Sequence, residues 1–167
     1  MKEIESNLSW DAYFMKHVYL AASKSKDPRT KIGAILVRDG IIISEGYNGF
    51  ARGVKDYKSR YIDRPTKYAF VVHAEDNSVL NAARAGIFTN GSICYTQGVP
   101  CNECAKSLIQ AGVKEIVVHK QWPNMVKKWE DAAKITRQMC FESKVKIRIL
   151  DEKLGTIAFI DDKKFNV

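Results

Sequence analysis

The chain has 167 residues, 46% of them hydrophobic, which suits one globular domain that buries most of its apolar surface. Lysine and arginine outnumber aspartate and glutamate by 27 to 19; the net charge of +8 is compatible with nucleic acid, with a phosphorylated ligand or with solubility alone. No segment resembles a secretory signal or the roughly 18 apolar residues of a membrane span, so we expect a cytoplasmic protein of one domain (1–167) without a membrane partner.

The first part of the chain predicts a helix and a β-hairpin. Apolar residues at helical spacing predict an amphipathic helix from Ser9 to Ser23, with Ser9 as its N-cap. Two β-branched runs, 31–37 and 41–46, are separated by turn residues and predict an antiparallel hairpin. From Tyr47 to Lys67 the sequence has no clear period, which predicts a long loop of the kind that is usually functional.

The second part of the chain alternates helices and strands. Helices are expected over 74–85 and 101–111, each ended by a glycine, and from about Asn124 to Cys140. The strands between and after them are expected at 92–96, 115–119 and 145–150. This order favours an α/β fold with one layered sheet, in which a hairpin lies on one side and helical crossovers join the other strands. The tail after Leu150 is expected to form an edge strand or a subunit contact.

Two short motifs carry the chemistry. His73-Ala74-Glu75 and Pro100-Cys101-Asn102-Glu103-Cys104 form the pattern H-x-E…P-C-x-x-C, in which His73 and Cys101 are 101 − 73 = 28 positions apart. This pattern is typical of zinc-dependent nucleobase deaminases as a class. Each half falls at the start of a predicted helix, so the first turns of two neighbouring helices can bring the ligands together. The other two cysteines, Cys94 and Cys140, are expected to be buried thiols.

The ligand set predicts a catalytic zinc site. One imidazole (His73) and two thiolates (Cys101 and Cys104) would leave the fourth position of a tetrahedral Zn²⁺ open for water. A helix N-terminus favours anions and should lower the pKa of both cysteines. Two thiolates weaken the zinc as a Lewis acid, so a general base is needed. Glu75 can take a proton from the water and pass it to a ring nitrogen and then to the departing amine.

Other interpretations of these residues were weighed. A lone C-x-x-C is often half of a closed structural zinc site, but a closed site needs a fourth ligand. The other histidines, His17 and His119, are better explained as structural residues of a helix and of a strand end. The specificity of the prediction therefore comes from the presence of both halves of the pattern.

The chain resembles the deoxycytidylate deaminase family from about Ser9 to Leu150. The resemblance is carried by Tyr13-Phe14-Met15, Ser25-Lys26-Asp27-Pro28, Ile32-Gly33-Ala34, Gly46-Tyr47-Asn48-Gly49, His73-Ala74-Glu75 with Asn81-Ala82-Ala83, and Pro100-Cys101-Asn102-Glu103-Cys104-Ala105-Lys106. It implies a three-layer cytidine deaminase-like fold with a central mixed five-stranded sheet flanked by helices. It also implies deamination of dCMP to dUMP, which supplies thymidylate synthesis, in a homohexamer activated by dCTP and inhibited by dTTP, with Mg²⁺ accompanying the triphosphate.

The same resemblance implies binding residues. Asn48, Ala74 and Thr96 are expected to contact the substrate. We expect a separate effector site near the hairpin, where cations and glycines could hold a triphosphate, formed by Lys24, Lys26, Arg29, Gly49, Arg52 and Gly53. Ordinary surface charge is the alternative for these cations. The stretch 97–99 is more polar and smaller than is usual in the family, which leaves the wall of the base pocket undefined.

Two rival functions share the zinc motif. A tRNA adenosine deaminase or a nucleic-acid cytidine deaminase would suit the positive charge, but the chain has no block of basic residues and resembles the nucleotide enzymes well outside the motif. We therefore expect no nucleic-acid partner. A non-catalytic zinc protein that binds nucleotides would leave Glu75, beside an open coordination position, without a role.

Overall fold

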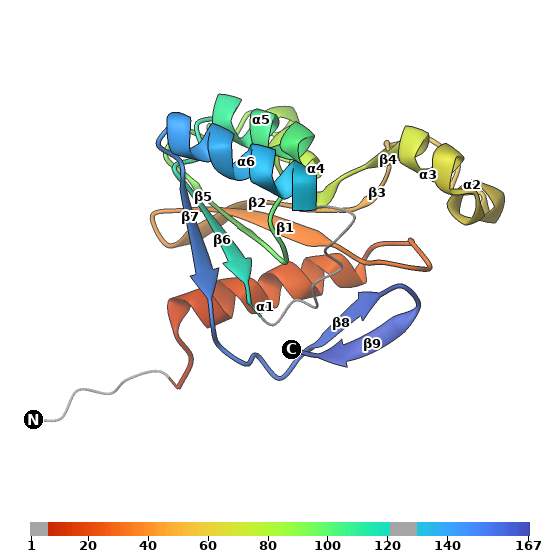
Figure 1. Ribbon diagram of the computed structural model, residues 1–167, viewed down its shortest axis with the longest axis horizontal. Coiled ribbons are helices and arrows are strands. Elements are labelled where there is room, and N and C mark those ends of the chain that lie inside the picture. The colour runs from red at the N-terminus through yellow and green to blue at the C-terminus, as the bar shows by residue number, and fades with distance from the viewer. Residues whose placement is uncertain (1–6, 121–129) are drawn as a thin grey trace, which may run out of the picture.

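The computed structural model describes residues 7–120 and 130–167, and a mixed five-stranded sheet forms its centre (Figure 1). The strand order is β2-β1-β5-β6-β7. The hairpin strands β1 (Gly33–Arg38) and β2 (Ile41–Tyr47) are antiparallel, and β1 also pairs antiparallel with β5 (Ile93–Thr96). The strands β6 (Glu115–His119) and β7 (Lys146–Leu150) continue the sheet in parallel. The five strands predicted from the sequence are thus confirmed.

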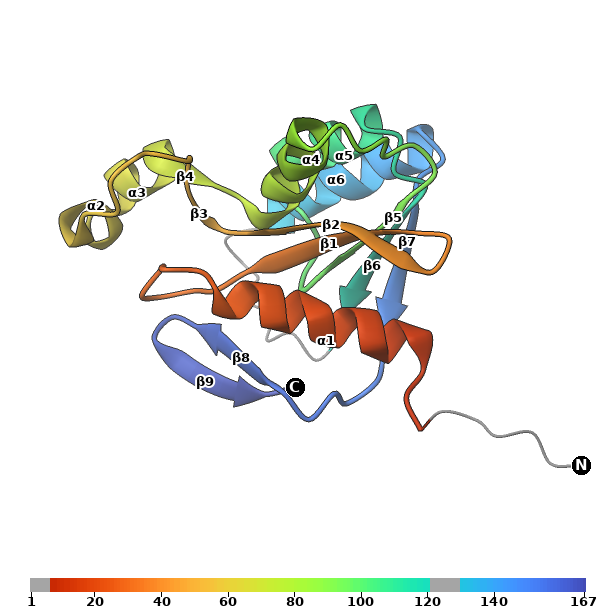
Figure 2. The same cartoon turned by 180° about the vertical axis from the view of Figure 1, so that it is seen from behind.

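Helices cover both faces of this sheet (Figures 1 and 2). One face carries α1 (Trp10–Ser23), and the other carries α4 (Ala74–Arg84), α5 (Asn102–Gln110) and α6 (Glu130–Glu142). The predicted start of the last helix, near Asn124, lies outside the described residues. The three-layer α/β architecture implied by the resemblance is confirmed. No described helix is both long enough and apolar enough to span a membrane.

The alternation of side chains along β1 builds two hydrophobic cores. Ala34 and Leu36 point into the core beneath α4, α5 and α6, whereas Ile35 and Val37 point into the core beneath α1. The expected buried thiols of Cys94 and Cys140 both lie in the first of these cores. Because both faces are covered, the inner strand β1 is apolar on both sides.

Glycine allows α4 to approach the hairpin closely. A Cβ atom at Gly46 would lie 2.3 Å from the carbonyl oxygen of Ala74 and 2.4 Å from the amide nitrogen of Ser78. Any side chain there would push the first turn of α4 away from β2. Gly46 therefore fixes the position of the helix start that carries the H-x-E motif.

The segment 49–72 is not the long loop that the sequence predicted. It forms an arm that stands out from the body in Figures 1 and 2. The arm consists of β3 (Gly49–Phe50), α2 (Lys58–Ile62), α3 (Arg64–Phe70) and β4 (Val71–Val72). Asp63 caps α3 by accepting a hydrogen bond from the amide of Thr66, and Pro65 lies in its first turn. The helices have five and seven residues, too short to produce a recognisable hydrophobic period.

The C-terminal tail pairs with itself. Strands β8 (Ile157–Ile160) and β9 (Lys163–Asn166) form a separate antiparallel hairpin, and their buried side chains join the core beneath α1. The prediction of a further edge strand of the main sheet is therefore wrong. The tail turns back at Asp161 and Asp162, which both have positive φ, and so cannot continue along the sheet.

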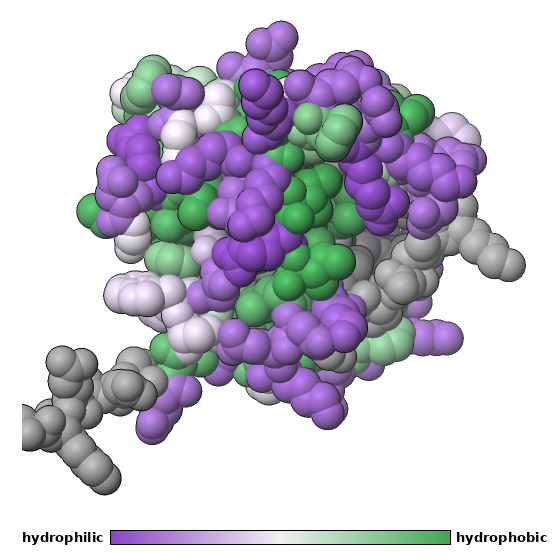
Figure 3. Space-filling model, turned by 60° about the vertical axis from the view of Figure 1, so that its left-hand side comes forward, coloured by the Kyte–Doolittle hydropathy of each residue, from purple (hydrophilic) through white to green (hydrophobic). Residues whose placement is uncertain are grey.

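Large apolar side chains also reach the surface. On the side of the molecule shown in Figure 3, hydrophobic side chains appear between hydrophilic ones. Phe141 of α6 is 82% exposed and Ile149 of the edge strand β7 is 62% exposed. These side chains offer apolar area that a protein contact could cover.

An ion-pair network joins α1 to the edge of the sheet. Asp11, in the first turn of α1, accepts hydrogen bonds from Arg148 of β7 and, at 2.7 Å, from the hydroxyl of Tyr95. Arg148 also donates to Glu115 of β6 at 2.7 Å. The hydrogen bond from Arg148, assisted by that from Tyr95, holds the pKa of Asp11 below its usual range despite partial burial.

The lowered pKa of Asp11 predicts part of the acid sensitivity of the fold. The folded chain binds fewer protons at this site than the unfolded chain, so the contribution is present above the ordinary pKa of aspartate and is lost as pH falls through the folded-state pKa. Asp11→Asn should lower the free energy of unfolding by about 1 kcal/mol at neutral pH, allowing for solvent screening, and should flatten its decline below about pH 5. Urea unfolding at several pH values measures both effects. Asp131→Asn is the control, because Asp131 is 93% exposed, and an equal effect of the two changes would contradict the prediction.

Candidate metal centre and active site

The two halves of the motif lie at the N-termini of neighbouring helices. His73 is the N-cap residue of α4 and directly follows β4, and Cys101 is the N-cap residue of α5. Cys104 lies in the first turn of α5, where it is fully buried. Both helices cover the same face of the sheet (Figure 2). The convergence expected from the sequence is therefore present.

The three side chains face one another at metal-binding distances. Nδ1 of His73 lies 3.4 Å from Sγ of Cys101 and 3.4 Å from Sγ of Cys104, and the two sulfur atoms are 3.5 Å apart. A tetrahedral zinc with bonds of about 2.0–2.3 Å needs its ligand atoms roughly 3.5–3.8 Å apart, so this donor set fits the ion. Within the described part of the chain, no fourth histidine, cysteine or acidic residue joins the group. A bound zinc would therefore keep one coordination position open.

Local electrostatics favour a thiolate at this centre. The hydrogen bond from the thiol of Cys104, together with the neighbouring His73, lowers the pKa of Cys101 to about 4. The hydrogen bond with Cys101 raises the pKa of His73 to about 9. The hydrogen bond with the Cys101 thiolate, together with burial, raises the pKa of Cys104. Thiolate and neutral imidazole are the forms that bind metals, so zinc must displace the remaining protons and its affinity should increase with pH.

Glu75 is the carboxylate of the centre. It lies in the first turn of α4 and is only 6% exposed. Its Oε1 accepts a 2.8 Å hydrogen bond from the hydroxyl of Thr96, at the end of β5. Burial raises the pKa of Glu75, while the positive charge on His73 and the Thr96 hydrogen bond oppose the rise. A carboxyl group with a raised pKa can both accept and return a proton near neutral pH.

The residues of this candidate site fall within a region that matches a known protein family. The model of the cytidine and deoxycytidylate deaminase zinc-binding region matches residues 8–120, which contain the three candidate ligands and Glu75. The chain belongs to this deaminase family.

Individual relatives of this deaminase agree with the family match. The deoxycytidylate deaminases of Mus musculus and Homo sapiens are both 38% identical to it over 122 residues, which make up 70% of this chain and 67% of theirs. ComE operon protein 2 of Bacillus subtilis is 34% identical over 155 residues, 90% of this chain and 82% of that protein. The dCMP deaminase of cyanophage S-TIM5, in its apo form, superimposes with a TM-score of 0.64 at 26% identity, covering 84% of this chain and 96% of the phage chain.

The expected substrate residues of the deaminase have different surroundings. The hydroxyl of Thr96 bonds Glu75 and also lies 3.3 Å from the carbonyl oxygen of Gly33. Ala74 is fully buried at the start of α4. The amide of Asn48 accepts from the backbone of Ile32 and donates to Asp27 and to the carbonyl of Thr30. Both N–H donors of Asn48 are thus engaged within the protein, and its oxygen retains one free lone pair.

The candidate effector residues of the deaminase do not share a common partner. Lys26 pairs with Asp56 of the arm at 2.5 Å, whereas Arg52 donates to Asn81 of α4 at 2.7 Å. Gly49 belongs to β3, and Gly53 has a φ of 82° that favours glycine. The side chains of Lys24 and Arg29 have no hydrogen bond or ion pair within the described residues.

Gln97, to which the sequence pattern assigns no role, is completely buried just after β5. Its side chain accepts from the amide of Gly33 at 2.7 Å and donates to the carbonyl of Lys31 at 3.3 Å. It therefore supplies the backbone partners that a longer β5 would have given to β1. The only signal in the sequence was a glutamine where an apolar residue is usual.

The remaining histidines lie outside the metal centre. His119, the last residue of β6, is buried, with Nδ1 bonded to the hydroxyl of Tyr19 and Nε2 to the carbonyl of Glu152. His17 packs its ring against Tyr13 on α1. His119 is thus at a strand end and His17 on the first helix, where the sequence placed them.

Proposed function

We propose that this chain hydrolyses dCMP to dUMP and ammonia, and so supplies dUMP for thymidylate synthesis. The observation that carries the proposal is the buried Glu75 beside three convergent metal ligands in a chain 38% identical to deoxycytidylate deaminases. A complex of the S-TIM5 enzyme with dCMP and dUMP, again with a TM-score of 0.64, lends support through the shared fold. Four free thiols are consistent with a reducing compartment such as the cytoplasm.

The reaction adds water to the amidine carbon of the cytosine ring and expels ammonia. His73, Cys101 and Cys104 would hold zinc, which when bound supplies a Lewis acid that makes water nucleophilic near neutral pH. Glu75 takes a proton from the attacking water and gives it to the neighbouring ring nitrogen. Glu75 then carries a second proton to the amino group, which leaves as ammonia. Thr96 holds the carboxylate of Glu75 in place through its 2.8 Å hydrogen bond.

The 5′-phosphate should contribute strongly to substrate recognition. The protein carries a net charge of +8, and one or two charge-assisted hydrogen bonds to a phosphate would amount to about 3 kcal/mol, or roughly 100-fold in kcat/KM. We therefore expect kcat/KM to be about two orders of magnitude higher for dCMP than for deoxycytidine. An absorbance assay with dCMP, deoxycytidine and an RNA hairpin measures this. Equal values for dCMP and deoxycytidine would indicate a nucleoside deaminase, and preference for the hairpin a nucleic-acid deaminase.

Regulation is part of the proposal. A homohexamer, in which dCTP with Mg²⁺ activates and dTTP inhibits, is supported by the exposed apolar side chains and by the cations beside the hairpin. An effector must bind active and inactive states differently to shift their balance. The response should therefore be sigmoidal in dCMP, more hyperbolic with dCTP, and suppressed by dTTP.

Substitution of one candidate effector residue tests this regulation. Arg52→Ala should weaken the dTTP response about tenfold while leaving turnover at saturating dCMP near that of the wild type, because one charge-assisted contact is lost. Initial rates at low dCMP with increasing dTTP measure the effect. Lys134→Ala on α6 is the control, since its ion pair among the described residues is with the exposed Asp131 of its own helix. Insensitivity of the wild-type enzyme to dTTP would refute the regulatory part alone.

A further inference from the structure

The arm (49–72) is attached to the body at its base and through side chains, among them Arg52, which donates to Asn81 of α4. The two-residue strands β3 and β4 pair with each other at its base. Two ion pairs then join the arm to the turn 25–30: Lys67 to Asp27, and Lys26 to Asp56. Within the arm, Phe50 stacks on Tyr61, with ring centroids 4.3 Å apart. The end of the arm leads directly into His73, so the position of the arm affects the start of α4.

The two ion pairs differ in burial. Asp27 is completely buried and the side chain of Lys67 is 12% exposed, with Nζ lying 2.5 Å from Oδ2. The side chain of Lys26 is 70% exposed in the other pair. An exposed pair contributes little because solvent screens it, whereas removal of one partner of a buried pair leaves a charge without compensation. The pair between Lys67 and Asp27 should therefore dominate the attachment.

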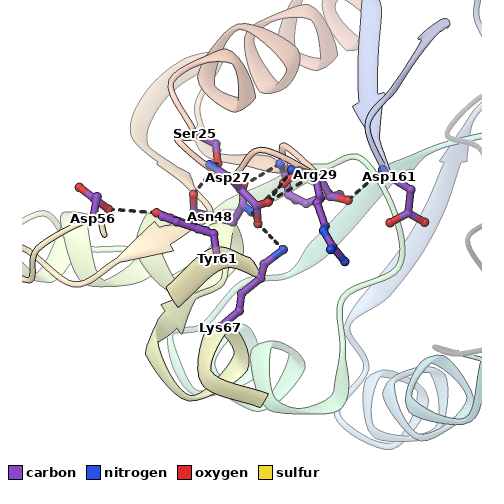
Figure 4. Close-up of polar contacts among 10 residues, drawn as sticks. Ser25, Asp27, Arg29, Asn48, Asp56, Tyr61, Lys67 and Asp161 are labelled. Carbon is purple, nitrogen blue, oxygen red and sulfur yellow. Dashed lines mark hydrogen bonds and ion pairs between the residues drawn. The ribbon is translucent and has the colours of Figure 1, made fainter. Parts of the chain in front are cut away.

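Asp27 lies at the centre of the contacts shown in Figure 4. Its Oδ1 accepts from the amides of Arg29 and Thr30, and its Oδ2 accepts from Nδ2 of Asn48 as well as from Lys67. One carboxylate thus links the turn, the amide of Asn48 and the arm. A displacement of Lys67 changes the charge balance at the same oxygen atom that orients Asn48.

We propose that Asp27 and Lys67 are positioning residues, which fix the arm and the amide of Asn48 relative to the metal centre and thereby set the affinity for substrate. This inference rests on the proposed function and on the expected contact of Asn48 with the substrate, because it assigns the pair to substrate capture. Neither residue touches the candidate metal ligands. Loss of the pair therefore affects KM more than kcat.

The test compares Lys67→Met with Asp56→Asn, because each substitution breaks one of the two ion pairs between the arm and the turn 25–30. Lys67→Met should speed amide exchange in α2 and α3 about tenfold, measured by hydrogen–deuterium exchange. It should raise KM for dCMP about tenfold, with kcat within about threefold of the wild type and zinc content unchanged. Asp56→Asn should change each quantity by less than about twofold, because the pair it breaks is exposed and the asparagine oxygen can still accept from Tyr61.

Several outcomes would overturn the proposal. Unchanged exchange and KM in Lys67→Met would make the pair incidental, and a parallel loss of kcat, zinc and global stability would make it merely structural. If Lys67→Met does not fold, Lys67→Gln, which keeps a hydrogen-bond donor, must show the same faster exchange and higher KM. Failure of both variants to fold would also refute a positioning role. Even if the wild-type protein does not deaminate dCMP, amide exchange in α2 and α3 still shows whether the ion pair between Lys67 and Asp27 holds the arm to the body.

Discussion

Glu75→Gln should reduce kcat for dCMP deamination by roughly 10²- to 10⁴-fold, the usual contribution of a general acid–base group. Glutamine has nearly the same size, and its oxygen can still accept the hydrogen bond from Thr96. It cannot take a proton from water and return it to the substrate. The variant should therefore keep its fold and its zinc while losing turnover.

Glu103→Gln is a matched control for this experiment. Glu103 lies in the first turn of α5, the other helix that carries metal ligands, but its side chain is 67% exposed and pairs with Lys106. Steady-state kinetics and metal analysis on both variants separate proton transfer from metal binding. Turnover by Glu75→Gln near the wild-type level would show that another group moves the protons.

Cys104→Ala should abolish both zinc binding and activity. The thiol is fully buried and lies 3.4 Å from Nδ1 of His73 and 3.5 Å from the sulfur of Cys101, so no solvent-exposed group can readily replace it. Two remaining protein ligands bind zinc far more weakly than three. We expect less than about a tenth of the wild-type zinc after dialysis, with thermal unfolding at a lower temperature because metal binding contributes to folding.

Cys140→Ala is the matched control for the loss of a thiol. Cys140 is a buried thiol of α6 that lies outside the metal cluster. Its removal leaves a small cavity, which should lower stability by about 1 kcal/mol without loss of zinc. Elemental analysis of both variants provides the measurement. Equal zinc in Cys104→Ala and in the wild type would remove Cys104 from the site.

The sequence predicted the parts of the fold that depend on local patterns. The β-branched runs located the sheet, and the glycines after α4 and α5, Gly86 and Gly112, marked helix ends with positive φ. The clustering of the three candidate metal ligands could be predicted because each belongs to a motif at a helix start. The order of the strands was then enough to predict that the N-termini of α4 and α5 lie close together.

Contacts between distant segments could not be predicted in this way. Asp27 and Lys67 are 40 positions apart, and nothing local marks their pairing. Thr96 was expected to contact substrate, but its bond to Glu75 depends on how β5 faces α4. The arm has the sequence pattern of a loop because its helices are too short to show a hydrophobic period, and its helix cap and ring stacking join residues whose contact no sequence pattern marks.

The most direct test of the proposed function is ammonia release from dCMP by the purified protein loaded with zinc, measured with and without dCTP. The account predicts one ammonia for each dUMP formed, and none from the same protein after Glu75→Gln. Intact dCMP after prolonged incubation with a folded wild-type protein that carries one zinc per chain would contradict it.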